Sequence, residues 1–314
     1  MDKMLLNEII ECLPKERTLF HYFKDRYALM LLSYYLDNQP QKISTLRQTA
    51  FAKLLQKPSL RPALALAGQG TLSPQHLAMV WGQELHFLLG ITSWGNRRYD
   101  TYYQTSRTGY NLVLQLNFSN QHEQAYQRLV KPSYEAYFNC YAHPTMQDKK
   151  EEERFRETLA WARIDLDFDS DEALIEEIQS DWIKEVISTF QRMKLHKDEE
   201  DKYYECGLDA EPAEVITYFN TVLKPYINVW EEAMLTAAIE FIRNELGIHN
   251  IYYHTYETGC ALKHCEPPRS LYTTIPRKFC FQETDEMPSF LNGLRYVKKN
   301  LRKVAKPRFF KLHL

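Results

Sequence analysis

Three side chains with strong hydrogen-bonding groups stand at every second position of EALIEEIQSDW, residues 172–182. They are Glu177, Gln179 and Asp181. A β-strand turns alternate side chains to opposite faces, so an extended segment would place these three on one face together with Ile175. Two carboxylates and an amide held together could orient a polar substrate, or shift the pKa of a carboxylate towards the value that a general base requires.

The opposite face of this strand would carry Ser180 and Trp182. Ser180 is a candidate group for orienting a substrate alongside Gln179, and Trp182 is a candidate substrate-binding residue. A structural interpretation stays open, in which Ser180 or Asp181 caps the helix predicted for WIKEVISTFQRMK, because short polar side chains accept hydrogen bonds from the first amides of a helix.

A second candidate strand, in IYYHTYETG, places Tyr252, His254 and Tyr256 on one face by the same alternation. Imidazole titrates near neutral pH and phenols can donate hydrogen bonds, so His254 is a candidate catalytic residue and Tyr256 a candidate substrate-binding residue. The alternative is that His254 is a hydrogen-bonded histidine of the core or the surface.

The six cysteines are scattered along the chain, which is typical of reduced thiols. Cys260, His264 and Cys265 form a C-x3-H-C cluster, but zinc sites usually contain paired spacings and no second pair is present. We therefore expect free thiols and no metal site. Cys140 and His143 do not indicate a thiol nucleophile, because no third member of a triad is evident.

The chain has 314 residues, with 39 basic and 41 acidic side chains and a formal net charge of −2. This balance provides no overall field that would attract nucleic acid or membrane, so such a partner must be met by a local patch. There is no apolar run near 18 residues, and the first residues carry acids where a signal peptide has a basic region. We expect a cytoplasmic protein without a membrane partner.

The hydrophobic pattern predicts a fold of the α+β or α/β class. Apolar residues recur with helical spacing from residue 4 to about 100, and with strand spacing in GYNLVLQLNF and in the expected hairpin of TLAWARIDLDF and ALIEEIQSDW. Helical spacing returns over residues 212–246, followed by Gly247 and the strand IHNIYYHTY. We expect a helical domain (1–105), an α/β domain with a mixed sheet flanked by helices (106–290), and a basic C-terminal helix or tail (291–314).

The C-terminal segment is basic and contains no acid after Glu286. It could bind the phosphates of a nucleic acid or contact a protein, or it could be a docked helix with a solvated basic face, and the balanced charge of the whole chain favours the docked helix.

Two stretches resemble known families. The segment IEEIQSDW, followed by the tryptophan-containing helix, the glycine and the I-x-x-x-T strand, resembles a domain of the large polyvalent proteins of phages and conjugative elements. This resemblance covers roughly residues 160–282. The order of hairpin, helix and strand, followed by SLYTTIPRKFCF, is also similar to the later half of a GNAT acyltransferase. Tyr272 and Phe281 resemble the tyrosine and phenylalanine of the Y-x-x-x-G-F stretch of that family, with eight residues between them instead of four, while Cys280 stands where the family has glycine.

The GNAT resemblance implies that neighbouring strands splay apart at the end of the EIQSDW strand. Glu177, Gln179, Asp181, His254 and Tyr272 would then converge on one cleft. GNAT enzymes bind the pyrophosphate of acyl-CoA with backbone amides of a glycine-containing loop after this strand. The segment IKEVISTFQRMKLHK, which follows Trp182, contains no glycine, so the usual mode of acyl-CoA binding is not expected and the cofactor stays unknown.

Two functions are consistent with these features. The first is a GNAT-like transferase for a small polar or aminoacyl-type substrate, with Glu177 or Asp181 as base and Tyr272 as acid. The second is a non-catalytic GNAT-like module that binds protein or nucleic acid in a bacterial mobile-element or host-defence setting. Fold similarity alone does not decide between them.

Overall fold

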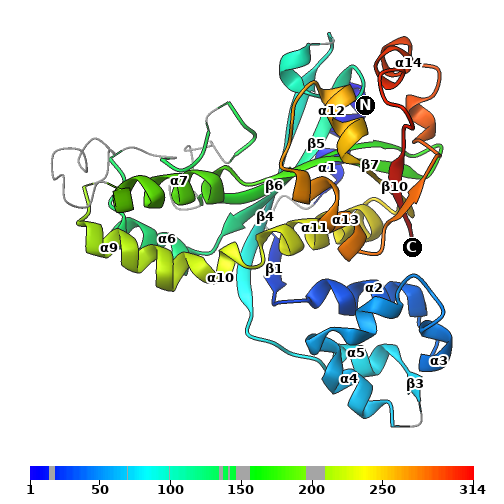
Figure 1. The fold of residues 1–314 in the computed structure, drawn as a ribbon, viewed down its shortest axis with the longest axis horizontal. Helices are drawn as coiled ribbons and strands as arrows, with labels where there is room; N and C mark the ends of the chain where they lie inside the picture. The colour runs from blue at the N-terminus through cyan, green and yellow to red at the C-terminus, as the bar shows by residue number, and fades with distance from the viewer. Residues whose placement is uncertain are drawn as a thin grey trace.

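A mixed sheet of eight strands forms the centre of the molecule (Figure 1). The computed structural model describes residues 1–13, 18–68, 70–98, 100–133, 137–140, 142–145, 156–195 and 209–314. The strand order is β1-β4-β5-β6-β7-β8-β10-β9, and every neighbouring pair is antiparallel except β7 and β8. The strands are β1 (Thr18–Tyr22), β4 (Leu85–Asn96), β5 (Gly109–Phe118), β6 (Thr158–Asp167), β7 (Glu172–Gln179), β8 (Asn250–His254), β9 (Gln282–Thr284) and β10 (Phe309–His313).

Helices flank this sheet, so the chain has the expected mixed α/β fold. Around the sheet lie α1 (Lys3–Cys12), α6 (Asn120–Leu129), α7 (Asp181–Leu195), α9 (Pro212–Thr217), α10 (Lys224–Ile227), α11 (Trp230–Glu240), α12 (Tyr256–Lys263), α13 (Thr274–Lys278) and α14 (Arg295–Leu301). Helices α7 and α11 pack on β6. A smaller core joins β7, β8 and β10 to α12 and α14 through Leu174, Tyr252, Leu262, Val297 and Phe309.

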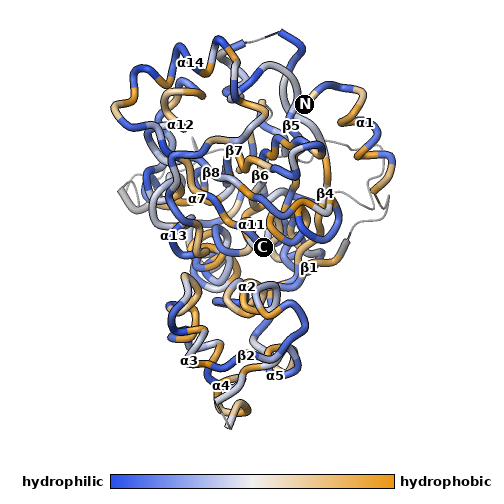
Figure 2. The backbone as a smooth tube through the Cα atoms, turned by 90° about the vertical axis from the view of Figure 1, so that its right-hand side faces the viewer, coloured by the Kyte–Doolittle hydropathy of each residue, from blue (hydrophilic) through white to orange (hydrophobic). Residues whose placement is uncertain are grey.

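A helical lobe projects from one end of the sheet (Figures 1 and 2). It contains α2 (Arg26–Leu36), α3 (Ile43–Leu46), α4 (Arg61–Leu66), α5 (Pro74–Ala78) and the short strands β2 (Gln41–Lys42) and β3 (Thr71–Leu72). Apolar and polar residues are mixed along its helices, as expected for helices that bury one face (Figure 2). No helix of the described residues is long and apolar enough to cross a membrane.

The helical pattern predicted for residues 4 to about 100 is wrong at two places, because β1 and β4 lie in this range and belong to the main sheet. Ser73 caps α5 and Pro74 begins it, and the helix ends at Ala78. The next apolar residues form β4, which pairs with β5 from Phe87 to Asn96. Long-range pairing decides the conformation of such segments, since short apolar runs fit a helix or a strand equally well.

The elements predicted after residue 108 are confirmed more closely. GYNLVLQLNF forms β5, the expected hairpin is β6 with β7, and residues 212–245 are helical. Gly247 adopts a left-handed φ of 68° and separates this helical stretch from β8. A left-handed backbone favours glycine, so the residue type and the helix end agree.

The C-terminal segment is part of the sheet as well as a helix. Val297 and Leu301 of α14 are buried, and its basic side chains face outwards. Residues 309–313 form β10, which lies between β8 and β9 and pairs Phe310 with Tyr253. The basic C-terminus is therefore not a separable tail, because five of its residues complete the sheet.

A β-bulge interrupts the centre of the sheet. Arg163 of β6 pairs with Glu177, while the next residue, Ile164, pairs with Ile175, so Glu176 is the extra residue in β7. The parallel pairing of β7 with β8 reaches Ile175 and is not continued beyond it. Strands β7 and β8 therefore part at Glu176, while β6 and β7 stay paired as far as Gln179.

We expect the Phe310→Ala variant to lose about 3–5 kcal/mol of unfolding free energy, because the buried ring of Phe310 in β10 would be replaced by a cavity. The Lys299→Ala variant on the exposed face of α14 is the control, with an expected change within about 0.5 kcal/mol. Urea unfolding followed by circular dichroism measures both. Equal effects in the two variants would contradict a structural role for β10.

Candidate functional site

A small pocket of about 130 Å³ lies on the polar face of the sheet next to the bulge. Its lining residues come from β4, β6, β7 and two loops: Trp94, Tyr102, Gln104, His143, Trp161, Arg163, Glu177 and Gln179. The register explains the grouping, since Trp161 lies opposite Gln179 and Arg163 opposite Glu177, and directly opposed residues share a face of the sheet. The volume is below the 300–1,000 Å³ that is usual for whole ligands, so the pocket suits a head group rather than a nucleotide.

The bulge turns two adjacent carboxylates towards this face. We expected Ile175, Glu177, Gln179 and Asp181 to share a face, and this is wrong for Ile175, which is buried in the main core. The extra residue shifts the alternation by one position, so that Glu176 and Glu177 both leave the core side. The prediction assumed unbroken alternation along the strand, and no residue type in the sequence indicates the bulge.

Glu177 forms ion pairs with Arg163 and with Lys263, whose Nζ lies 3.4 Å from Oε2 of Glu177. Burial raises the pKa of Glu177, but the positive charges of Lys263 and Arg163 outweigh this effect and lower the pKa below its ordinary value. Glu177 is therefore an anion at neutral pH. A carboxylate with a lowered pKa suits electrostatic binding better than the role of general base.

His254 and Glu176 form a separate, fully buried network with Ser106. Nε2 of His254 lies 3.0 Å from Oε2 of Glu176 and 2.9 Å from Oγ of Ser106, and the backbone N–H of Ser106 donates to Glu176 at 3.0 Å. Burial raises the pKa of Glu176, but the hydrogen bond from His254 and the nearby positive charges lower it to about 2. Burial lowers the pKa of His254.

This network does not have the geometry of a catalytic triad. In a triad the nucleophile and the acid contact different ring nitrogens, whereas here Ser106 and Glu176 meet the same Nε2 of His254. All three residues are also fully buried. The prediction that His254 could be a hydrogen-bonded core residue matches this placement, and the network joins the loop at Ser106 to β7 and β8.

Tyr272 fills the gap between β7 and β8 together with Lys263. Its hydroxyl accepts a hydrogen bond from Lys263 and donates one to the backbone oxygen of Glu176 at 3.2 Å. The side chain is fully buried. Gly259 of α12 makes room for the ring, since a Cβ at this position would lie 3.2 Å from Cε1 of Tyr272. Burial raises the pKa of Tyr272 well above its ordinary value. Tyr272 reaches Glu177 only through Lys263.

Asp181 holds the imidazole of His143 at the wall of the pocket. Oδ1 of Asp181 lies 2.8 Å from Nδ1 of His143 and accepts a hydrogen bond of 2.7 Å from Gln179, while Oδ2 accepts one of 3.2 Å from Trp161. A carboxylate only accepts hydrogen bonds, so Asp181 favours the proton on Nδ1, although the amide nitrogen of Gln179 also lies 3.2 Å from this atom. Asp181 is buried, whereas the side chain of His143 is 33% exposed.

Three of the predicted substrate-binding residues lie outside this pocket. Ser180 caps α7, as the structural interpretation predicted, because its Oγ accepts a hydrogen bond of 3.1 Å from the amide of Ile183. Trp182 is fully buried in an aromatic cluster on the core side, 4.7 Å from the ring of Tyr126, and donates to Tyr218. Tyr256 begins α12 beside Arg269 and does not continue the β8 strand, which ends at His254.

The structure thus brings Glu177, Gln179 and Asp181 together and places His254 and Tyr272 in the buried network next to them. Sequence reasoning missed Arg163, and it considered His143 only as a partner of Cys140 and discarded it. The alternation of Trp161, Arg163 and Asp165 in TLAWARIDLDF was the available signal, since an arginine in the middle of a strand must find a partner. His143 gave no such signal, because a loop brings it to Asp181.

We expected no zinc at Cys260, His264 and Cys265, and these residues do not form a group of metal ligands in the described part of the chain. A different group of possible metal ligands is found there. His264 ends α12 with a left-handed φ of 53°. Comparison with protein-family models, with curated proteins and with solved structures finds no match. The function must therefore be argued from the geometry.

We expect acid to destabilise the native protein through Glu176. Its pKa falls from an ordinary 4.5 to about 2 on folding, so its contribution is complete above pH 4.5 and is lost as the pH falls towards 2. Between pH 5 and pH 2.5 the native chain should lose about 2–3 kcal/mol more unfolding free energy than the Glu176→Gln variant. Urea titrations at each pH measure this difference, and the exposed Glu286→Gln variant should behave like the native chain.

Proposed function

We propose that the chain is a GNAT-like transferase that acts on the amino group of a small polar, aminoacyl-type substrate. The observation that carries this proposal is a pocket of head-group size with aromatic walls, Trp94, Tyr102 and Trp161. The charge of Glu177 is already balanced by Arg163 and Lys263, so an amino group would be held by cation–π contact with the rings and by hydrogen bonds to acceptors of the pocket. The amide oxygen of Gln179, which accepts no hydrogen bond from the described residues, is a further acceptor for it.

His143 is the proposed general base, in place of Glu177 or Asp181. An amine attacks an acyl group only after losing its proton, and His143 supplies a basic nitrogen whose orientation Asp181 fixes. In the proposed step the bound ammonium group first loses one proton to solvent. The neutral amino nitrogen then forms a bond with the acyl carbon, the bond from that carbon to the sulfur or oxygen of the donor breaks, and His143 takes the second proton from the nitrogen and passes it to the departing sulfur or oxygen. Asp181 acts through His143 and is a positioning residue.

The donor that fits least is acyl-CoA bound in the usual GNAT manner. The gap that the resemblance predicts between β7 and β8 is occupied by Lys263 and Tyr272, and no glycine follows Trp182. A compact aminoacyl thioester fits better, because it needs neither this gap nor a glycine-containing loop. The mobile-element setting and the cytoplasmic location stay parts of this proposal.

A ligand screen by thermal shift tests the binding step. Alanine amide should raise the melting temperature by a few degrees at about 100 times its Kd, since a ligand that binds only the native state stabilises it by about 2.7 kcal/mol at that concentration. N-acetylalanine amide, which lacks the ammonium charge, should produce no shift. Acetyl-CoA should produce none either.

Variants separate binding from transfer. Tyr102→Ala removes a wall residue that is 58% exposed, so the variant should fold normally and lose most of the shift with alanine amide. His143→Gln should keep the shift and lose transfer from an aminoacyl thioester to an amine, measured by mass spectrometry. Glu286→Gln serves as the control for both. Equal shifts with the amide and its acetylated form would contradict the proposal.

A second candidate, the non-catalytic module, is favoured by one specific surface. Arg295, Lys298, Lys299 and Arg302 of the α14 region are exposed and form no ion pair within the described part of the chain. Lys306, Arg308 and Lys311 are different, since they pair with Asp285, Glu283 and Glu286. The four exposed cations could contact phosphates of a nucleic acid.

We expect this surface, if it binds nucleic acid, to give a slope of about −3 to −4 in log K against log salt, because each of four phosphate contacts contributes about −0.9. Fluorescence anisotropy with a duplex measures the slope. Replacing the four cations by glutamine should abolish binding, while Arg308→Gln should not. Deleting the segment is not a usable test, because β10 would be lost with it.

A further inference from the structure

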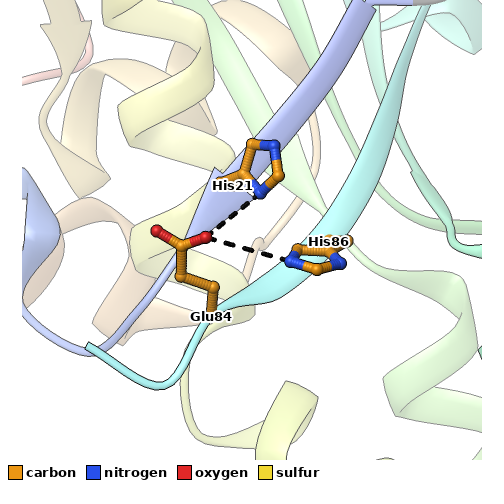
Figure 3. Close-up of side chains that lie close together, drawn as sticks. All are labelled: His21, Glu84 and His86. Atoms are coloured by element: carbon orange, nitrogen blue, oxygen red, sulfur yellow. Dashed lines mark ion pairs between the residues drawn. The ribbon is translucent and has the colours of Figure 1, made fainter. Parts of the chain in front are cut away.

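Three potential metal ligands meet at the edge of the sheet, outside the pocket. They are His21 of β1, Glu84, and His86 near the start of β4. Nδ1 of His21 lies 3.2 Å from Oε2 of Glu84, Nε2 of His86 lies 3.9 Å from the same oxygen, and all three ligand atoms lie within 4.8 Å of one another. Figure 3 shows the carboxylate of Glu84 facing both imidazoles.

The backbone fixes this arrangement. His21 and His86 are direct partners in the antiparallel pairing of β1 with β4, and such partners hold their Cβ atoms about 4.5–5.5 Å apart on one face. Glu84 precedes His86 by two residues, which returns its side chain to the same side of the chain. Two neighbouring strands supply the histidines, and Glu84 immediately precedes one of these strands, so no distant loop has to close to bring the three groups together.

We propose that His21, Glu84 and His86 bind one divalent first-row transition-metal ion, with Zn²⁺ as the representative. Zinc binds imidazole nitrogen and carboxylate oxygen at about 2.0–2.2 Å, so tetrahedral ligands lie roughly 3.3–3.5 Å apart. The distances from Oε2 of Glu84 to His21 and His86, 3.2 and 3.9 Å, fall on either side of this spacing. Small side-chain rotations would bring the ligand atoms to it.

The surroundings of Nδ1 of His21 are a second indication of a metal site. Its Nδ1 is screened from solvent and has no hydrogen-bond partner in the described part of the chain, although a carboxylate oxygen lies 3.2 Å away. A buried polar atom without a hydrogen bond is unfavourable. A metal ion between Nδ1 and the carboxylate would satisfy this nitrogen.

The proposed metal site is distinct from the pocket. His86 and Trp94 lie on the same face of β4. They are eight positions apart along the strand, which corresponds to about 26 Å at about 3.3 Å per residue. Three protein ligands leave at least one coordination position for water or another small ligand. The ion would also hold the edge strand β1 against β4.

Metal binding can be measured on the full chain. After removal of metal with a chelator, titration with Zn²⁺ in a calorimeter should show one ion per chain, and zinc should raise the melting temperature. Mg²⁺ should do neither, because it prefers oxygen ligands. Co²⁺ bound at the same place should give the visible absorption of a four- or five-coordinate site.

Single variants locate the site. His86→Ala and His21→Ala should each weaken zinc binding at least about 100-fold, since even the loss of an outer-sphere partner typically costs 10–100-fold. The matched control is His249→Ala, which removes a similarly exposed histidine beside Asp171 at 3.2 Å, where the described residues supply no third ligand. All three histidines are partly exposed, so circular dichroism should show folded variants.

Two results would overturn the proposal. One is the absence of a saturable zinc site in the native chain. The other is zinc binding that survives His86→Ala and His21→Ala at full strength, which would place the ion elsewhere, for example at Cys260 and Cys265.

Discussion

The burial of two adjacent carboxylates at the bulge is the constraint on which the centre of this molecule depends. Glu176 and Glu177 both turn towards one face of the sheet, where both are buried and lose most of their hydration. A buried charge is tolerated only when opposite charge and hydrogen bonds replace the lost hydration. Arg163 and Lys263 provide the charge, and Ser106 and His254 provide the hydrogen bonds.

This requirement explains why the gap between β7 and β8 is filled. Lys263 has to reach Glu177 from α12, and its path crosses the point where the two strands part. Tyr272 then packs against the ammonium group and shares the backbone oxygen of Glu176 with it. The same contacts that neutralise the carboxylates remove the space that a splayed pair of strands would otherwise offer to a ligand. The accessible chemistry is displaced to the neighbouring pocket of Gln179 and His143.

Much of the fold could be predicted from the sequence, because alternation and helical spacing are local properties. The β5 strand, the β6–β7 hairpin and the long helical stretch before Gly247 follow from these patterns. The strands β1 and β4 could not be predicted, since their conformation is set by pairing with residues distant in the chain. The site was predicted in part, for Glu177, Gln179 and Asp181, and it was missed where a bulge or a loop sets the geometry.

The position of β10 inside the sheet bears on how the chain is built during translation. About fifty residues separate β8 from β10, and β9 is held in the sheet only by β10. Until residues 309–313 leave the ribosome, one edge of β8 stays without its partner and offers free amide and carbonyl groups to any extended nascent segment. A pause in synthesis within this interval would expose that edge for longer, so the stretch between Thr255 and Arg308 sets the time during which the half-built sheet has an unpaired edge.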